Sequence, residues 1–144
     1  MKKTLFTLSL LLASLLHAKN ENYTLTVEAN GFKNSKGEAQ FSLYNKEGSI
    51  PDKQLNKYYR KIRVNINHGY AKVIFKDLPE GRYAVSLYHD ENNNHQIDKG
   101  LLMPVEGVGL SNFESVSFFH LPNFKDASFL LNKNMAIKIK VINL

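Results

Sequence analysis

Short runs in which apolar and polar residues alternate recur along this chain, and this period of two restricts the fold more than any other feature. From Tyr23 to Ala29 every second residue is apolar. Successive side chains of a β-strand point to opposite faces of the sheet, so such a run predicts a strand with one face in the core. Similar runs lie at 38–44, 58–66, 70–75, 83–89 and 135–142.

These runs indicate an all-β fold. With one further strand expected near 115–119, they give six or seven antiparallel strands in two sheets, an immunoglobulin-like or transthyretin-like sandwich. Residues 19–144 have the length of a single domain, which buries enough surface to fold without crosslinks. The chain has no cysteine, which excludes disulfides and thiolate metal sites. Gly107 and Gly109, on either side of Val108, predict a tight turn.

The first 18 residues have the three parts of a secretory signal peptide. Lys2 and Lys3 precede an apolar run over 5–16, and Ala18 supplies a small residue for cleavage. The run is shorter than the roughly 20 apolar residues of a membrane-spanning helix. We therefore expect a periplasmic or secreted protein with no membrane span after cleavage.

The net charge is modestly positive. The whole chain carries 19 Lys and Arg against 13 Asp and Glu. Loss of Lys2 and Lys3 with the signal peptide leaves 17 basic residues, a formal charge of about +4. This excess favours a solvated surface over nucleic-acid binding, because export separates the protein from nucleic acids.

An oxygen-rich loop follows the expected strand at 83–89. Four of its side chains stand at the first, third, fifth and ninth positions of a calcium-binding EF-hand loop, and the Gln96 carbonyl stands at the seventh. Calcium takes six to eight oxygen ligands, which alternate residues of one tight loop can supply. The sequence thus predicts a calcium site built from Asp90, Asn92, Asn94, Gln96 and Asp98.

Two positions depart from the EF-hand pattern. The sixth is His95 where glycine is usual, and the twelfth is Leu101 where glutamate is usual. Histidine tolerates a positive φ better than most residues, and Glu106 could fold back as the missing carboxylate ligand. Only two carboxylates remain in the loop, so unless Glu106 folds back in this way we expect an affinity of at best about 10⁻⁴ to 10⁻³ M. The alternative is a polar loop whose Asp and Asn side chains bond only to their own backbone.

The histidines give little support for catalysis or a transition-metal site. No His-x-x-x-His pair and no glycine-flanked serine turn occurs, so we assign no catalytic residue. His89 falls on the inner face of its expected strand, where a structural histidine is the simpler interpretation. If the protein were an enzyme, an acid–base group formed by His89, Asp90 and Glu106 would be the first candidate.

Three blocks of the sequence resemble the DUF2141 family of exported bacterial proteins. They are 89–92 with Asn94 and Asp98, then 103–112, then 122–127. The resemblance implies a β-sandwich in the cell envelope and no particular activity. Separately, a phenylalanine followed by Leu-Pro-x-Gly-x-Tyr and an alternating strand, within 73–87, is similar to transthyretin-like and carboxypeptidase-regulatory sandwiches.

Loops held by a rigid scaffold often carry function. We therefore expect a non-catalytic binding module that recognises an envelope protein or glycan through the loops between Asp90 and Asn112, with calcium stiffening the first of them. An envelope enzyme acting at the same loop and a structural envelope component are the alternatives. The sequence does not indicate the oligomeric state.

Overall fold

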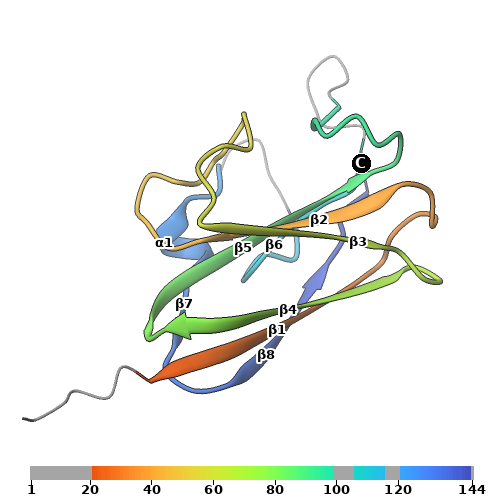
Figure 1. Cartoon of the computed structure of the whole chain (residues 1–144). Coiled ribbons are helices and arrows are strands. Elements are labelled where there is room, and N and C mark those ends of the chain that lie inside the picture. The colour runs from red at the N-terminus through yellow and green to blue at the C-terminus, as the bar shows by residue number, and fades with distance from the viewer. Residues whose placement is uncertain (1–20, 99–105, 116–120, 144) are drawn as a thin grey trace, which may run out of the picture.

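The structure is a computed structural model that describes residues 21–98, 106–115 and 121–143 (Figure 1). Within these residues it contains eight strands and one short helix. In chain order they are β1 (Asn22–Asn30), β2 (Glu38–Tyr44), β3 (Arg60–Asn65), β4 (Tyr70–Pro79), β5 (Gly81–Asp90), β6 (Val108–Leu110), α1 (Phe124–Ala127), β7 (Phe129–Leu131) and β8 (Met135–Lys140).

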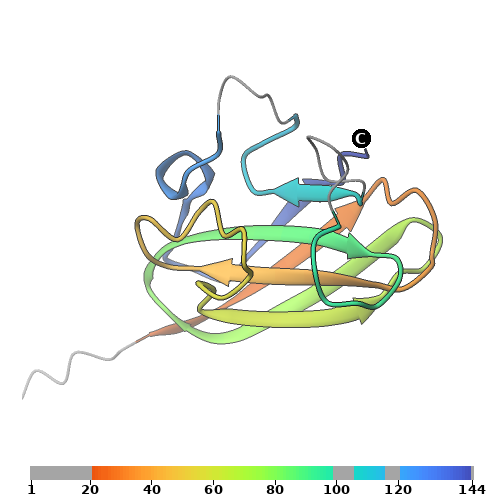
Figure 2. The same cartoon turned by 90° about the horizontal axis from the view of Figure 1, so that it is seen from above.

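The strands form two sheets that face each other as a sandwich (Figures 1 and 2). One sheet has three strands in the order β4-β1-β8, and the other has the order β3-β2-β5-β6, with β7 pairing with the start of β5. The predicted all-β fold with two sheets is confirmed. The prediction of antiparallel strands throughout is wrong, because β8 runs parallel to β1 over Leu25–Asn30 and Met135–Lys140.

The core lies between the two sheets and contains the alternating apolar residues. Leu25 and Val27 of β1 face Phe41 of β2, and all three side chains are fully buried. His89 also points into this core, where its ring packs edge-on against Phe32 with 5.4 Å between ring centroids. The period-two pattern therefore identified the inner face of these strands correctly.

The other face of the five-stranded sheet is buried as well. Gln40, Ser42 and Tyr88 point away from the core, yet each is at most 2% exposed. At one end this face is covered by a second apolar cluster, which consists of Tyr44, Ile50, Ala84, Phe124 and Ala127. The central strands β2 and β5 are consequently buried on both sides.

The tight turn predicted around Gly107 and Gly109 is wrong. Val108–Leu110 forms β6 and pairs with Ser86–Tyr88 of β5. Glycine is required at position 109 because a larger residue does not fit. A Cβ there would lie 2.7 Å from the Ile139 side chain and 3.1 Å from that of Leu87. The predictions of a signal peptide at 1–18 and of a strand near 115–119 fall wholly or almost wholly outside the described residues.

A tyrosine fixes the turn between β4 and β5. The Tyr83 hydroxyl donates a hydrogen bond of 2.9 Å to the Pro79 carbonyl, four residues upstream. This contact resembles the tyrosine corner of immunoglobulin-like sandwiches. It gives a physical reason for the Leu-Pro-x-Gly-x-Tyr pattern, in which Gly81 lies directly beneath the Tyr83 ring.

Among the described residues no helix is long and apolar enough to cross a membrane, since α1 has only four residues.

Candidate functional site

The candidate site is the loop that follows β5 at the rim of the sandwich. Asp90 ends β5 opposite Glu38 of β2, and its side chain is almost completely buried. The two carboxylate oxygens accept hydrogen bonds from the backbone amides of Asn94 (3.1 Å) and His95 (2.9 Å). The carboxylate of Asp90 therefore gathers the next five residues around itself.

Two residues in the left-handed conformation produce this bend. Asn93 has φ +57° and His95 has φ +63°. In EF-hand numbering they are the fourth and sixth positions, and the sixth is where glycine makes the sharp turn. His95 adopts the conformation for which glycine is preferred, as the tolerance of histidine for positive φ predicted. Its Nδ1 also lies 3.3 Å from the Asp90 carboxylate.

The side chains of Asn92, Asn94 and Asp98 converge. The amide Nδ2 atoms of both asparagines donate to the Asp98 carboxylate, at 2.6 Å from Asn92 and 2.8 Å from Asn94. Their Oδ1 atoms accept hydrogen bonds from the backbone amides of Asn94 (3.0 Å) and Gln96 (2.9 Å). Gln96 takes part in the loop through this amide. These side chains therefore lie at one bend, but the two asparagines direct their amide nitrogens and not their oxygens at Asp98. The calcium site stays a prediction.

Glu106 folds back onto the loop from the segment before β6. It is only 4% exposed, and its two oxygens accept from the backbone amides of Glu91 (3.1 Å) and Asp98 (3.0 Å). It therefore ties the first and last residues of the loop together. Burial raises the pKa of Glu106, although the two amide hydrogen bonds act in the opposite direction.

This donor set restricts which cation could bind. Among the described residues there is no group of three or more His, Asp or Glu side chains that could together hold a metal ion. A cation at this loop would take many of its ligands from amide and backbone carbonyl oxygens, which suits a hard cation and disfavours transition metals. The existing hydrogen bonds match the alternative of a self-bonded loop. The two are compatible, because each carbonyl or carboxylate oxygen has a second lone pair.

Sequence reasoning missed the base on which the loop rests, the turn before β2. Gly37 (φ +62°) packs so closely that a Cβ on it would lie 1.8 Å from the Asp90 carbonyl oxygen. Asn34 donates from Nδ2 to the Glu91 carboxylate at 2.9 Å. These residues read only as turn formers in the sequence. The one signal in the sequence was a glycine directly before an expected strand, and it does not say what the glycine contacts.

The acid–base group of His89, Asp90 and Glu106 does not form around an accessible centre. Adjacent residues of a strand point to opposite faces, so His89 lies in the core while the Asp90 side chain turns to the other side. His89 is fully buried and donates from Nε2 to the Lys36 carbonyl at 2.7 Å. Its Nδ1 has no hydrogen-bond partner among the described residues and lies 3.9 Å from the Glu91 carboxylate.

The comparisons with known proteins point to one family. The DUF2141 family, described as an uncharacterized protein conserved in bacteria, matches residues 27–139. No curated protein and no solved structure gives a match. The matched region contains the loop, its Glu106 closure and six of the eight described strands in full, with the second half of β1 and all but the last residue of β8. The chain therefore belongs to the DUF2141 family.

Proposed function

We propose that this protein is an exported, non-catalytic binding module whose loop at 90–98 is stiffened by a calcium ion. The convergence of Asp90, Asn92, Asn94 and Asp98 around one bend is the observation that carries the proposal. The backbone of this bend turns at His95, where an EF-hand loop has its glycine.

The charges in the loop favour a cation at this place. The Asp98 carboxylate accepts hydrogen bonds from two neutral side-chain amides. It has no cationic partner within 4.0 Å among the described residues. A calcium ion would supply the missing positive charge. It would be held by the Asp90 and Asp98 carboxylates, the Asn92 and Asn94 amide oxygens and the Gln96 carbonyl, with Glu106 closing the loop. This set predicts weak affinity, about 10⁻⁴ to 10⁻³ M.

The proposal extends to location and partner. The signal-like segment at 1–18 supports export to the periplasm or beyond. The loop rests on two strands that are buried on both faces, and rigid scaffolds of this kind hold binding loops in place. We assign the loops between Asp90 and Asn112 to recognition of an envelope protein or glycan. The Tyr83–Pro79 contact favours an immunoglobulin-like over a transthyretin-like sandwich.

Thermal unfolding with and without calcium tests the metal site. A ligand that binds only the native state raises stability by mass action. With the affinity above, 10 mM calcium should add about 1.4 to 2.7 kcal/mol, a rise of several degrees in Tm. Replacing Asp98→Asn should abolish the calcium-dependent shift. Glu47→Gln, the loss of one carboxylate in an exposed turn, is the matched control and should keep the shift.

Magnesium provides the test of specificity. It requires near-ideal octahedral geometry and sheds water reluctantly, so 10 mM magnesium should shift Tm much less than calcium. An unchanged Tm with calcium in the wild-type protein, or equal shifts in the wild type and Asp98→Asn, would overturn the calcium site.

Affinity purification from native envelopes tests the binding role. The tagged protein should retain a partner in calcium and release it in a chelator, and mass spectrometry or glycan analysis would identify that partner. Retention of the same partner by a variant lacking the 91–98 loop would contradict recognition through this loop.

A further inference from the structure

Two neighbouring edge strands of this sandwich lie side by side with a seam between them. In the described part of the chain β3 pairs with the strand β2 and β4 with the strand β1. Apart from the bridge between Asn67 and Tyr70 at their connection, the facing edges of β3 and β4 are unpaired. The two strands are consecutive in the chain and belong to different sheets, and they separate as they leave the short connection between them (Figure 1). The resulting cleft of about 510 Å³ is lined by Arg60–Ile62 and Ile74–Asp77.

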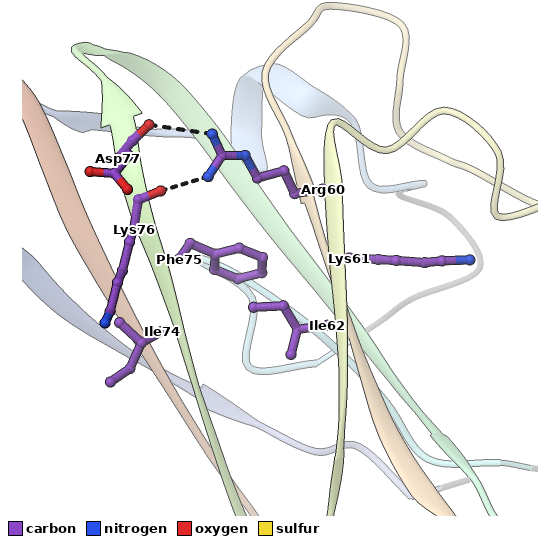
Figure 3. Close-up of a pocket in the computed structure, with 7 residues that line it drawn as sticks. All are labelled: Arg60, Lys61, Ile62, Ile74, Phe75, Lys76 and Asp77. Atoms are coloured by element: carbon purple, nitrogen blue, oxygen red, sulfur yellow. Dashed lines mark hydrogen bonds between the residues drawn. The ribbon is translucent and has the colours of Figure 1, made fainter.

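The floor of the seam is apolar and incompletely covered. Figure 3 shows Ile62 and Phe75 pointing into the space between the two strands. Phe75 of β4 is only 2% exposed, whereas Ile62 and Val64 of β3 are half-buried although they pack against the core. The unpaired N–H and C=O groups of an edge strand are a template for a further strand, and here such a strand would also cover these partly exposed side chains.

The outer face of β3 is cationic. β3 carries Arg60, Lys61 and Arg63 and no acidic residue. None of these cations lies within 4.0 Å of a carboxylate in the described part of the chain. Lys61 lies over the Tyr58 ring at 4.8 Å, and Arg63 donates from Nε to Gln40 at 2.8 Å. Within the described residues the positive charge of the strand is therefore not neutralised by a carboxylate.

Arg60 closes the wide end of the seam. Its guanidinium donates to the backbone carbonyls of Lys76 and Asp77 on β4 (Figure 3). These two carbonyls accept hydrogen bonds from an arginine side chain instead of from the backbone of a neighbouring strand. The contact joins β3 to β4 at this end, and beyond it the edge of β3 has no strand partner among the described residues.

We propose that the edge of β3 is a docking site for an extended acidic segment of another protein, which adds as a strand to the five-stranded sheet. Alternate side chains of this segment would lie on opposite faces of the sheet. Apolar side chains would lie beside Ile62 and Val64 on the inner face, and carboxylates beside Lys61 and Arg63 on the outer face. Strand addition obtains affinity from main-chain hydrogen bonds and specificity from alternate side chains.

The charges select this occupant over a second copy of the chain. Two β3 strands side by side would bring their cations close to one another, and like charges on paired strands are destabilising. The site goes beyond the calcium-dependent role proposed above, since none of its residues belongs to the 90–98 loop.

Fluorescence anisotropy with a fluorescein-labelled peptide of alternating glutamate and valine tests the proposal. This peptide should bind the wild-type protein, and binding should weaken with salt. Peptides in which lysine replaces glutamate, or serine replaces valine, should bind at least about tenfold more weakly, as should the glutamate–valine peptide N-methylated at alternate residues. Replacing Lys61→Glu should weaken binding about tenfold.

Lys138→Glu is the matched control. Lys138 is an exposed lysine on β8, the edge strand at the far side of the other sheet, so this variant changes the net charge equally. It should bind the peptide like the wild type, and both variants should keep the wild-type Tm. Equal weakening by the two substitutions, full binding by the N-methylated peptide, or binding of a sulfated polysaccharide but not the peptide would overturn the proposal. Binding should be equal in calcium and in chelator, which separates this test from that of the loop.

Discussion

In β2 and β5 the two faces of the five-stranded sheet are both buried but are stabilised in different ways. On the inner face, Phe41 and Leu87 pack against the three-stranded sheet through apolar contacts alone. On the outer face the side chains form two short hydrogen-bonded chains. Arg63 donates to Gln40 and Gln40 donates to Ser42, while Ser86 donates to Tyr44 and Tyr44 donates to Asp52.

The outer face also contains an exception. The Tyr88 hydroxyl is buried and has no hydrogen-bond partner among the residues that the structure describes, although its neighbours on the sheet are paired. A buried polar group without a partner costs free energy, whereas a paired one contributes a little. Burial therefore implies stabilisation on the inner face. On the outer face the contribution of each residue depends on whether its polar atom has a partner.

The largest difference between the faces should come from truncating an inner residue. Phe41→Ala removes a fully buried ring and leaves a cavity, which should cost about 3 to 5 kcal/mol. Ser42→Ala, one residue along the same strand, removes one hydrogen-bond acceptor and should cost about 1 kcal/mol. Urea unfolding of both variants measures the difference, and equal losses would mean that the inner face is not packed as described.

The outer face can be tested with two tyrosines. Tyr44→Phe removes a hydroxyl that bonds to Asp52 at 3.2 Å and to Ser86 at 3.4 Å, and should cost about 1 kcal/mol. Tyr88→Phe removes the hydroxyl that lacks a partner in the described part of the chain and should be neutral or stabilising. The same change thus has opposite expected signs at two positions of one face. A loss in Tyr88→Phe as large as that in Tyr44→Phe would show that the Tyr88 hydroxyl has a partner in solution.

A further difference between variants of the outer face should be seen above pH 10. Burial raises the pKa of Tyr44 and of Tyr88 to about 12, from the usual value of 10.0. Because the native state holds these protons more tightly, their contribution is fully present below pH 10 and is lost as the pH rises towards about 12. Urea unfolding across this range should show falling stability, with a shallower fall in Tyr88→Phe. Identical slopes in the two proteins would argue against a raised pKa for Tyr88.

The sequence allowed the local features of the fold to be predicted because they depend on local spacing. Alternation located β1, β2, β4, β5 and β8, and the order of Asp and Asn in 90–98 placed these residues at one bend. Pairing between distant segments leaves no such pattern. The parallel register of β8 on β1 and the seating of Gly37 under Asp90 depend on contacts across more than 50 residues.

Short strands were also missed for a physical reason. β6 and β7 have three residues each, too few to show a period of two. Gly107 and Gly109 suggested a turn, but Gly109 is required by the approach of Ile139. The buried outer face of β2 was not evident either, because Gln40 and Ser42 look like solvent-facing residues until their partners are known.

The position of β8 has a consequence for how the protein is made. β1 is the middle strand of its sheet, and its parallel neighbour lies 110 residues later in the chain, as in the hydrogen bond from the Thr24 amide to Asn134. Until the ribosome has released this last strand, one side of β1 has no partner and the apolar layer beneath it stays open. Pairing over so long a separation is slow, so we expect the three-stranded sheet to be completed late in folding.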